Sequence, residues 1–297
     1  MDPGIDDALA LMLALRSPEV QIIGISTVAG NAPVELTSAN ARRVLEYLNA
    51  EIPVARGVEH PLKHPLAGAL DYHGPDGLGQ CGLPSPSLPL YPAPAWDFLS
   101  QKILAAPGEI TLVATGPLTN LALAFEHYPE ICRKLAGIVL MGGAYGLTPY
   151  GKGNQTPFAE FNIWQDPEAA YKVFTSGVDI IAVGLDVTMD PKTRLEREHL
   201  EQLKVGHTHT ARLAARLSEY AIERYGHCEL HDPLALAALL DPSLFNLIPA
   251  SVEVVRGDGP ERGSTRLFPN KTSRIKVASA VDGPRFLNLF LSRMLKE

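Results

Sequence analysis

The sequence contains few cysteines and no long hydrophobic run. Its three cysteines lie far apart in a chain of 297 residues and never occur as Cys-x-x-Cys, which argues against a disulfide framework or a cysteine zinc site. No apolar run approaches the roughly 18 residues that a membrane-spanning helix needs, and the first residues do not form a basic signal peptide. We therefore expect a cytoplasmic protein without a membrane partner.

Positive charge and phosphate-binding motifs are also scarce. Lys and Arg number 26 against 33 Asp and Glu, a net charge of −7, and they form no basic run, so a nucleic-acid partner is not expected. The motifs G-x-G-x-x-G after a strand, G-x-x-x-x-G-K-[ST] and G-x-S-x-G are missing, which disfavours kinases, dehydrogenases and serine hydrolases. The 46% of hydrophobic residues is nevertheless enough for a large buried core.

Short apolar runs alternate with helical patterns along most of the chain. Strands are predicted at residues 20–28, 110–114, 138–141, 178–184, 251–255 and 274–279. Helices are predicted at residues 7–16, 36–48, 118–126 and 167–175, with a helical insertion at 195–240 and a long Pro- and Gly-rich loop at 60–94. This alternation predicts one Rossmann-like α/β domain over residues 1–297, with a mostly parallel central sheet flanked by helices.

Polar residues follow the predicted strands at the points where they end. They are Gly30-Asn31, Thr115-Gly116-Pro117, Gly142-Gly143 and Asp186. Ligands of parallel sheets bind at the carboxyl ends of the strands, so these segments are expected to form a single site.

Three carboxylates, Asp2, Asp6 and Asp7, lie within six residues at the start of an apolar helix. Helix capping by Asp6 or Asp7 would explain one of them. Three neighbouring carboxylates repel one another unless a cation compensates them, and Ca²⁺ and Mg²⁺ prefer such oxygen ligands. The cluster therefore favours a site for a hard cation.

Other polar segments allow both a structural and a chemical interpretation. His231 and Asp232 precede a helix and could simply begin it, or they could supply a proton donor beside a metal-binding carboxylate. Residues 154–162 could bind sugar hydroxyls or form a solvated turn, and residues 73–79 could be a flexible surface turn. Spacing alone does not decide between these readings.

The combined motifs resemble the inosine-uridine-preferring nucleoside hydrolases. The motifs are DPGIDDA at 2–8, VAGN at 28–31, HG at 73–74 with GL at 77–78, ATGPLTN at 114–120, MGGA at 141–144, AEFN at 159–162 with DPEA at 166–169, GLD at 184–186 and HD at 231–232. The resemblance covers essentially the whole chain, with the motifs in the family's order. It implies Ca²⁺-dependent hydrolysis of the N-glycosidic bond of ribonucleosides (uridine, cytidine and/or inosine) to ribose and free base, in nucleoside salvage.

The resemblance also implies roles for individual residues. The implied metal ligands are the carboxylates of Asp2, Asp7 and Asp232 and the backbone oxygen of Thr115. The implied catalytic residues are Asp2 as the base for water, His231 as the proton donor to the leaving base, and Asn31. The implied substrate contacts are Asp6, Asn162 and Asp232 to the 2′- and 3′-hydroxyls, Asn154 and Glu160 to the 5′-hydroxyl, Met141 and Phe161 along the ribose, and His73 near the base. A homo-oligomer, dimer or tetramer, is implied as well.

Two features depart from the family pattern. An apolar strand normally precedes the position of Asp2, whereas here only Met1 does, so the first strand is expected to be truncated or to begin upstream. The segment 225–230 is shorter than in some relatives and leaves the preferred base open. A nucleoside-binding protein with lost or reduced catalysis is therefore an alternative, and a Mg²⁺ phosphohydrolase is disfavoured by the missing phosphate motifs.

Overall fold

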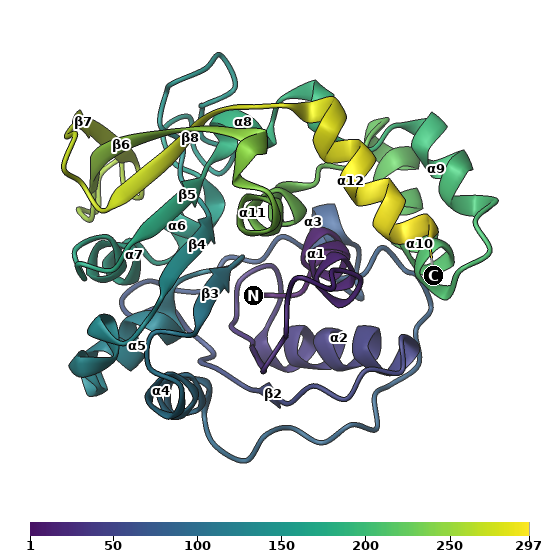
Figure 1. Cartoon of the computed structure of the whole chain (residues 1–297), viewed down its shortest axis with the longest axis horizontal. Helices are drawn as coiled ribbons and strands as arrows, with labels where there is room; N and C mark the ends of the chain where they lie inside the picture. Colours follow the sequence, from purple (N-terminus) through teal and green to yellow (C-terminus); the bar gives the residue numbers. More distant parts are fainter. Residues whose placement is uncertain (297) are drawn as a thin grey trace.

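A computed structural model describes residues 1–296. Its larger sheet consists of β3 (Thr111–Ala114), β4 (Gly137–Met141), β5 (Ile180–Val183), β6 (Phe245–Val254), β7 (Thr265–Pro269) and β8 (Ile275–Val281). The strands lie in the order β3-β4-β5-β8-β6-β7 (Figure 1). The first four are parallel, whereas β6 pairs antiparallel with both β8 and β7. The predicted α/β fold with a mostly parallel central sheet is confirmed.

Helices cover this sheet. They are α1 (Ile5–Leu15), α2 (Val34–Tyr47), α3 (Leu70–His73), α4 (Ala95–Ala105), α5 (Thr119–His127), α6 (Phe161–Gln165), α7 (Pro167–Phe174), α8 (Leu185–Thr188), α9 (Arg197–Lys204), α10 (His209–Tyr225), α11 (His231–Leu240) and α12 (Gly283–Leu295). In Figure 1, α4, α5 and α7 lie on one side of the parallel strands, and α1, α11 and α12 lie on the other. The predicted helical insertion corresponds to α9, α10 and α11.

The first predicted strand, residues 20–28, is wrong in extent. Only β1 (Ile25–Ser26) is a strand, and it pairs in parallel with β2 (Val54–Ala55) in a separate two-stranded sheet. A strand persists only where its backbone groups have ladder partners, and β2 reaches just these two residues. The apolar residues just before Ile25 have side chains that favour a strand, but they do not pair with β2 and therefore form no strand.

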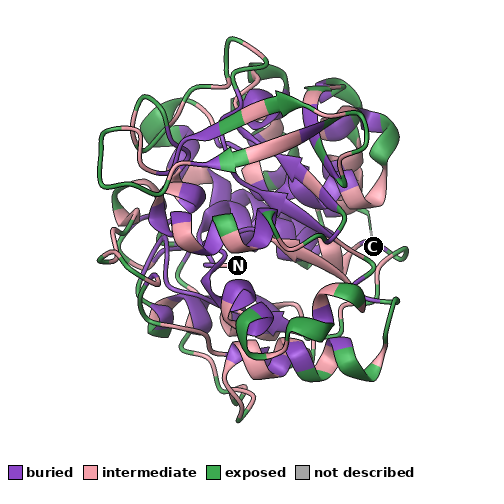
Figure 2. Ribbon diagram, turned by 90° about the vertical axis from the view of Figure 1, so that its left-hand side faces the viewer, coloured by how far each residue is buried: buried purple, intermediate pink, exposed green. Residues whose placement is uncertain are grey.

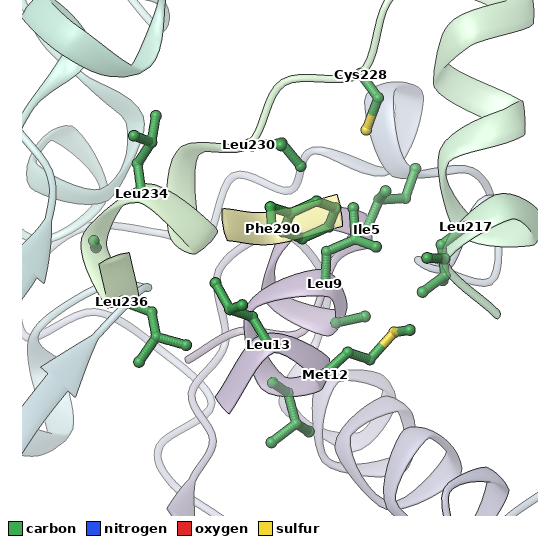
Figure 3. Packing of buried hydrophobic residues seen from close by; sticks show 14 of the residues in the cluster. Ile5, Leu9, Met12, Leu13, Leu217, Cys228, Leu230, Leu234, Leu236 and Phe290 are labelled. Carbon is green, nitrogen blue, oxygen red and sulfur yellow. The ribbon is translucent and has the colours of Figure 1, made fainter. Parts of the chain in front are cut away.

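The helix α1 lies in the centre of the main hydrophobic core. Nine of its 11 residues are buried. Figure 3 shows Leu9 and Leu13 of α1 near three apolar side chains of the same core. These are Leu230, which precedes α11, Leu236 of α11 and Phe290 of α12. Buried residues also run through the central strands (Figure 2). Because most of α1 is buried in this core, the polar residues of its first turn are held in fixed positions.

Asp166 links three segments of the fold. It caps α7 by accepting from the backbone N–H of Ala169 (3.0 Å), and it accepts from Thr119 Oγ1 (2.7 Å) and from the N–H of Leu62 (2.9 Å). Asp166→Ala would leave these donors unpaired, so we expect the free energy of unfolding to fall by about 3 kcal/mol in urea titrations. Asp190, which caps only a short turn through Lys192 N–H (3.0 Å), is the control. A loss no larger in Asp166→Ala than in Asp190→Ala would contradict this role.

In the part of the chain that the structure describes, no helix is both long enough and apolar enough to cross a membrane.

Candidate active site

Three carboxylates come together where the first turns of two helices meet. Asp6 and Asp7 lie in the first turn of α1, and Asp232 lies in the first turn of α11. One carboxylate oxygen from each lies within 4.8 Å of the others, and all three side chains are buried. The positive ends of both helix dipoles face the cluster and offset part of its charge.

Burial and mutual repulsion make the charged forms of these carboxyl groups unfavourable. Burial and, after it, the charge of Asp7 raise the pKa of Asp6 to about 8. The pKa of Asp232 also lies well above its usual value because of burial and then because of Asp6 and Asp7. Among residues 1–296 no Lys or Arg forms an ion pair with this group, although the charge of the Met1 amino group lowers the pKa of Asp7 and of Asp232. A buried group of carboxylates of this kind is the donor set that a hard divalent cation fits.

Asp7 organises the turn that holds the cluster. Its Oδ2 accepts from the N–H of Gly4 (3.1 Å), the residue that precedes α1, and its Oδ1 accepts from Thr115 Oγ1 (2.8 Å). The N-cap of α1 is Gly4, so the alternative explanation of Asp6 or Asp7 as N-cap is wrong, and Asp7 instead accepts from the N–H of this N-cap residue. Through its hydroxyl, Thr115 at the end of β3 lies directly beside the carboxylate of Asp7.

Asp2 is buried close by but is not one of the three grouped carboxylates. Its Oδ2 accepts from the N–H of Asn31 (2.7 Å), whereas its Oδ1 has no hydrogen-bond partner among residues 1–296. Gly30 and Gly116 pack against this carboxylate so closely that a Cβ at either position would overlap it. The site therefore retains one buried carboxylate oxygen able to accept a ligand.

Two of the predicted site residues are histidines, of which His73 is buried and His231 is half-buried. Nδ1 of His73 accepts from the N–H of Ile5 (3.1 Å), and Nδ1 of His231 shares a hydrogen bond with Thr188 Oγ1 (2.8 Å). Burial lowers the pKa of His231 to about 4 and that of His73 to about 3. A ring with so low a pKa is neutral around pH 7, so the proton donor that the resemblance implies at His231 would be a neutral imidazole.

The predicted ribose contacts lie around the end of β4. Glu160 caps α6, accepting from Asn162 N–H (2.8 Å) and, through its other oxygen, from Gly143 N–H (3.0 Å). Asn162 donates from Nδ2 to the backbone oxygen of Met141 (3.3 Å). Glu160, Asn162 and Met141 are buried, so these hydrogen bonds hold the side chains of Glu160 and Asn162 in place at this end of the sheet.

The remaining predicted contacts are more open. Asn154 is exposed, and its Oδ1 accepts from the N–H of Phe161 (2.9 Å), which closes the loop between them. Phe161 is half-buried at the start of α6. Asn31 donates from Nδ2 to Asp7 Oδ2 (3.4 Å) and to the backbone oxygen of Asp2 (3.2 Å), so it joins the acidic residues of the site.

The structural roles of some supporting residues were not predicted from the sequence. Asp186 accepts from the N–H groups of Tyr145 (2.7 Å) and Leu147 (2.5 Å) and thereby shapes the loop after β4. The GLD motif gave the position of Asp186 but not its role in holding the loop after β4. Tyr72 stacks on Tyr225 with ring centroids 5.1 Å apart. No local pattern could have brought these two tyrosines together, since more than a hundred residues separate them.

The comparisons with known proteins agree on one family. The family model described as inosine-uridine preferring nucleoside hydrolase matches residues 1–288. The Citrobacter koseri protein named pyrimidine-specific ribonucleoside hydrolase RihA is 41% identical over 255 residues, covering 83% of this chain and 80% of the relative. A protein of the same name from Salmonella newport is 40% identical, covering 99% of this chain and 96% of the relative.

Solved structures give the same result. The chain is similar to a purine-preferring ribonucleoside hydrolase from Gardnerella vaginalis, with a TM-score of 0.92, 34% identity and coverage of 99% of this chain and 96% of the other. It is also similar to the plant nucleoside hydrolase PpNRh1, with a TM-score of 0.91, 36% identity and coverage of 100% and 98%. The chain therefore belongs to the inosine-uridine preferring nucleoside hydrolase family, and it is an enzyme.

Proposed function

We propose that this enzyme hydrolyses the N-glycosidic bond of ribonucleosides to ribose and free base with the help of Ca²⁺. The buried group of Asp6, Asp7 and Asp232 beside His231 is the observation that carries the proposal. The similar proteins are named for pyrimidine and for purine ribonucleosides, so uridine, cytidine and inosine are all candidate substrates. The homo-oligomer that the resemblance implies stays a prediction.

We assign the cation to Asp7, Asp232 and Asp2, with the backbone oxygen of Thr115. Asp7 and Asp232 already share the group of neighbouring oxygens, and Asp2 retains an oxygen without a hydrogen-bond partner among the described residues. The hydroxyl of Thr115 anchors that residue beside Asp7 (2.8 Å). When bound, calcium would orient the attacking water and favour its deprotonation, for which Asp2 is the assigned base.

The acidic residues also suit the sugar chemistry. Breaking the bond to a poor leaving group gives the ribose the character of an oxocarbenium ion, which nearby carboxylates stabilise. Asp6 and Asp232 are assigned to the 2′- and 3′-hydroxyls together with Asn162, while Glu160 and Asn154 are assigned to the 5′-hydroxyl. Holding the hydroxyls in place lets binding energy contribute to distortion of the ring.

On the side of the base, His231 is the assigned donor and His73 its neighbour. Because burial keeps His231 neutral, it would act by donating a ring N–H toward the negative charge that develops on the departing base. Thr188, at 2.8 Å from Nδ1, orients the ring.

Release of free base from uridine and inosine, with and without a calcium chelator, tests the function. We expect release that stops with the chelator and resumes when Ca²⁺ is added back. Binding of nucleosides without release would support the alternative of a nucleoside-binding protein of this fold. Release that the chelator leaves unchanged would contradict the assigned cation.

Asn162→Ala should slow hydrolysis of uridine and of inosine by a similar factor, roughly 10²-fold, because the ribose is common to both substrates. The measurement is kcat/KM for the two nucleosides side by side. Asn246→Ala is the control, because Asn246 is an exposed residue of β6 that bonds Ser279 (2.7 Å). A large change in the ratio of the two kcat/KM values would place Asn162 at the base instead.

A further inference from the structure

Asp186 is a buried carboxylate to which the proposed reaction gives no role. It lies in the first turn of α8, which begins two residues after β5 ends, at the same end of the sheet where Met141 completes β4. A buried carboxylate requires hydrogen-bond donors, so its partners show which part of the chain it holds. Figure 1 shows α8 next to the loop that follows β4.

The donors to Asp186 come from the first residues of this loop. Oδ2 accepts from the N–H of Tyr145 (2.7 Å), while Oδ1 accepts from the N–H groups of Leu147 (2.5 Å) and Thr148 (3.3 Å). The hydroxyl of Thr148 also donates to the backbone oxygen of Asp186 (2.7 Å). Hydrogen bonds to a carboxylate are roughly twice as strong as those between neutral groups, so this one residue fixes the path of the chain over residues 145–148.

The loop returns to the same carboxylate at Gly151. A Cβ at Gly151 would lie 2.1 Å from Asp186 Oδ1, so the backbone passes too close to the carboxylate for any side chain to fit. Asn154 follows three residues later, and its Oδ1 accepts from the N–H of Phe161 (2.9 Å). Asn154 is thus held between two anchors, one at Asp186 and the other at the start of α6.

Glu160 is linked to the start of α8 as well. Its Oε2 accepts from the N–H of Gly143 (3.0 Å), and the backbone oxygen of Gly143 accepts from the N–H of Leu185 (2.9 Å), the residue before Asp186. Asn154 and Glu160, the two side chains assigned above to the 5′-hydroxyl of the ribose, are therefore both connected through the loop to the same two residues of α8.

We propose that Asp186 is a positioning residue for recognition of the 5′-hydroxyl, because it holds the loop after β4 in the path that brings Asn154 and Glu160 to this group. The inference rests on the proposed function, which assigns those two side chains to the 5′-hydroxyl. Loss of Asp186 should therefore weaken the enzyme's hold on nucleosides that carry this hydroxyl. A residue that only stabilised the fold would affect nucleosides with and without the hydroxyl alike.

The test compares Kd and kcat/KM for uridine and for 5′-deoxyuridine, which lacks only the 5′-hydroxyl. We expect the unaltered chain to bind uridine roughly 10-fold more tightly, the usual effect of a hydrogen bond to a charged group. Asp186→Asn keeps the size of the side chain but replaces one acceptor oxygen with an NH₂ group, which cannot accept from the loop. It should reduce the preference to below about 3-fold and leave 5′-deoxyuridine nearly unchanged. Asp179→Asn is the matched control at the opposite end of β5, where the side chain is 59% exposed and pairs with Arg274, and it should keep the full preference.

A second variant, Gly151→Ala, covers the case in which Asp186→Asn folds poorly. It retains the carboxylate but moves the loop away from it, so we expect the same loss of preference and faster amide exchange over residues 145–151. Adding Asn154→Ala to either variant should cause little further loss, because Asn154 no longer reaches the hydroxyl.

Equal weakening of uridine and of 5′-deoxyuridine in these variants would make Asp186 a purely structural residue and overturn the proposal. An unchanged preference in both variants, or an unaltered chain that binds the two nucleosides equally, would overturn it as well. Binding is measured separately from base release. A chain that binds uridine more tightly than 5′-deoxyuridine without hydrolysing it would therefore contradict the proposed activity, while the loss of that preference in Asp186→Asn would still support the positioning role.

Discussion

Asp232→Asn is expected to release calcium from the enzyme and to slow ribonucleoside hydrolysis by at least about 10³-fold. The substitution keeps the shape of the side chain and removes one negative charge from the buried group that it forms with Asp6 and Asp7. Tight binding of Ca²⁺ needs several anionic oxygens, and the electrostatic help of a metal is worth several kcal/mol, at about 1.4 kcal/mol for each factor of ten. Elemental analysis gives the calcium content, and base release gives the rate.

Substitution of Asp232 tests the assigned cation site more specifically than substitution of Asp7 does. The carboxylate of Asp7 also accepts hydrogen bonds from the N–H of Gly4 (3.1 Å) and the hydroxyl of Thr115 (2.8 Å), so Asp7→Asn would disturb the turn as well as the cation. Asp258→Asn provides the control, because it makes the same change of charge at a side chain that is 74% exposed. Calcium retained at one equivalent in Asp232→Asn would remove this residue from the ligand set.

Most of the fold could be predicted because the signals for it are local. Apolar runs gave the positions of β3, β4 and β5 to within about two residues, and the alternation with helices indicated a parallel sheet. The prediction of a strand over residues 20–28 was too long. The side chains there favour a strand, but only Ile25 and Ser26 have a neighbouring strand with which to pair. An apolar run becomes a strand only where a neighbouring strand can form backbone hydrogen bonds with it.

The site was predictable in its composition more than in its geometry. Clustering of Asp6 and Asp7 in one turn follows from their spacing, and their meeting with Asp232 followed from the resemblance to the family. The sequence could not show that Asn31 N–H donates to the carboxylate of Asp2 (2.7 Å), because 29 positions of the chain separate the two residues. It also could not show that burial lowers the pKa of His231 to about 4, because burial depends on the packing of the whole domain.

His231→Ala is expected to slow hydrolysis of inosine and uridine by roughly 10²–10³-fold, the usual cost of losing a donor to developing negative charge. A natural nucleobase leaves with negative charge that needs such a donor. A nitrophenyl riboside has a leaving group that is stable as an anion, so its hydrolysis should be nearly unchanged. Steady-state kcat for both kinds of substrate in the same variant measures the difference, and the unaffected substrate shows that the site remains folded.

Thr188→Val is the matched variant for this prediction. It keeps the size of the side chain but removes the hydroxyl that lies 2.8 Å from Nδ1 of His231. Because the ring would lose its orientation and keep its N–H, we expect a smaller loss of roughly 10-fold on natural nucleosides, again with little effect on the nitrophenyl riboside. If His231→Ala slowed both kinds of substrate equally, the histidine would act on the ribose, the cation or the fold. Its assignment as donor to the leaving base would then be withdrawn.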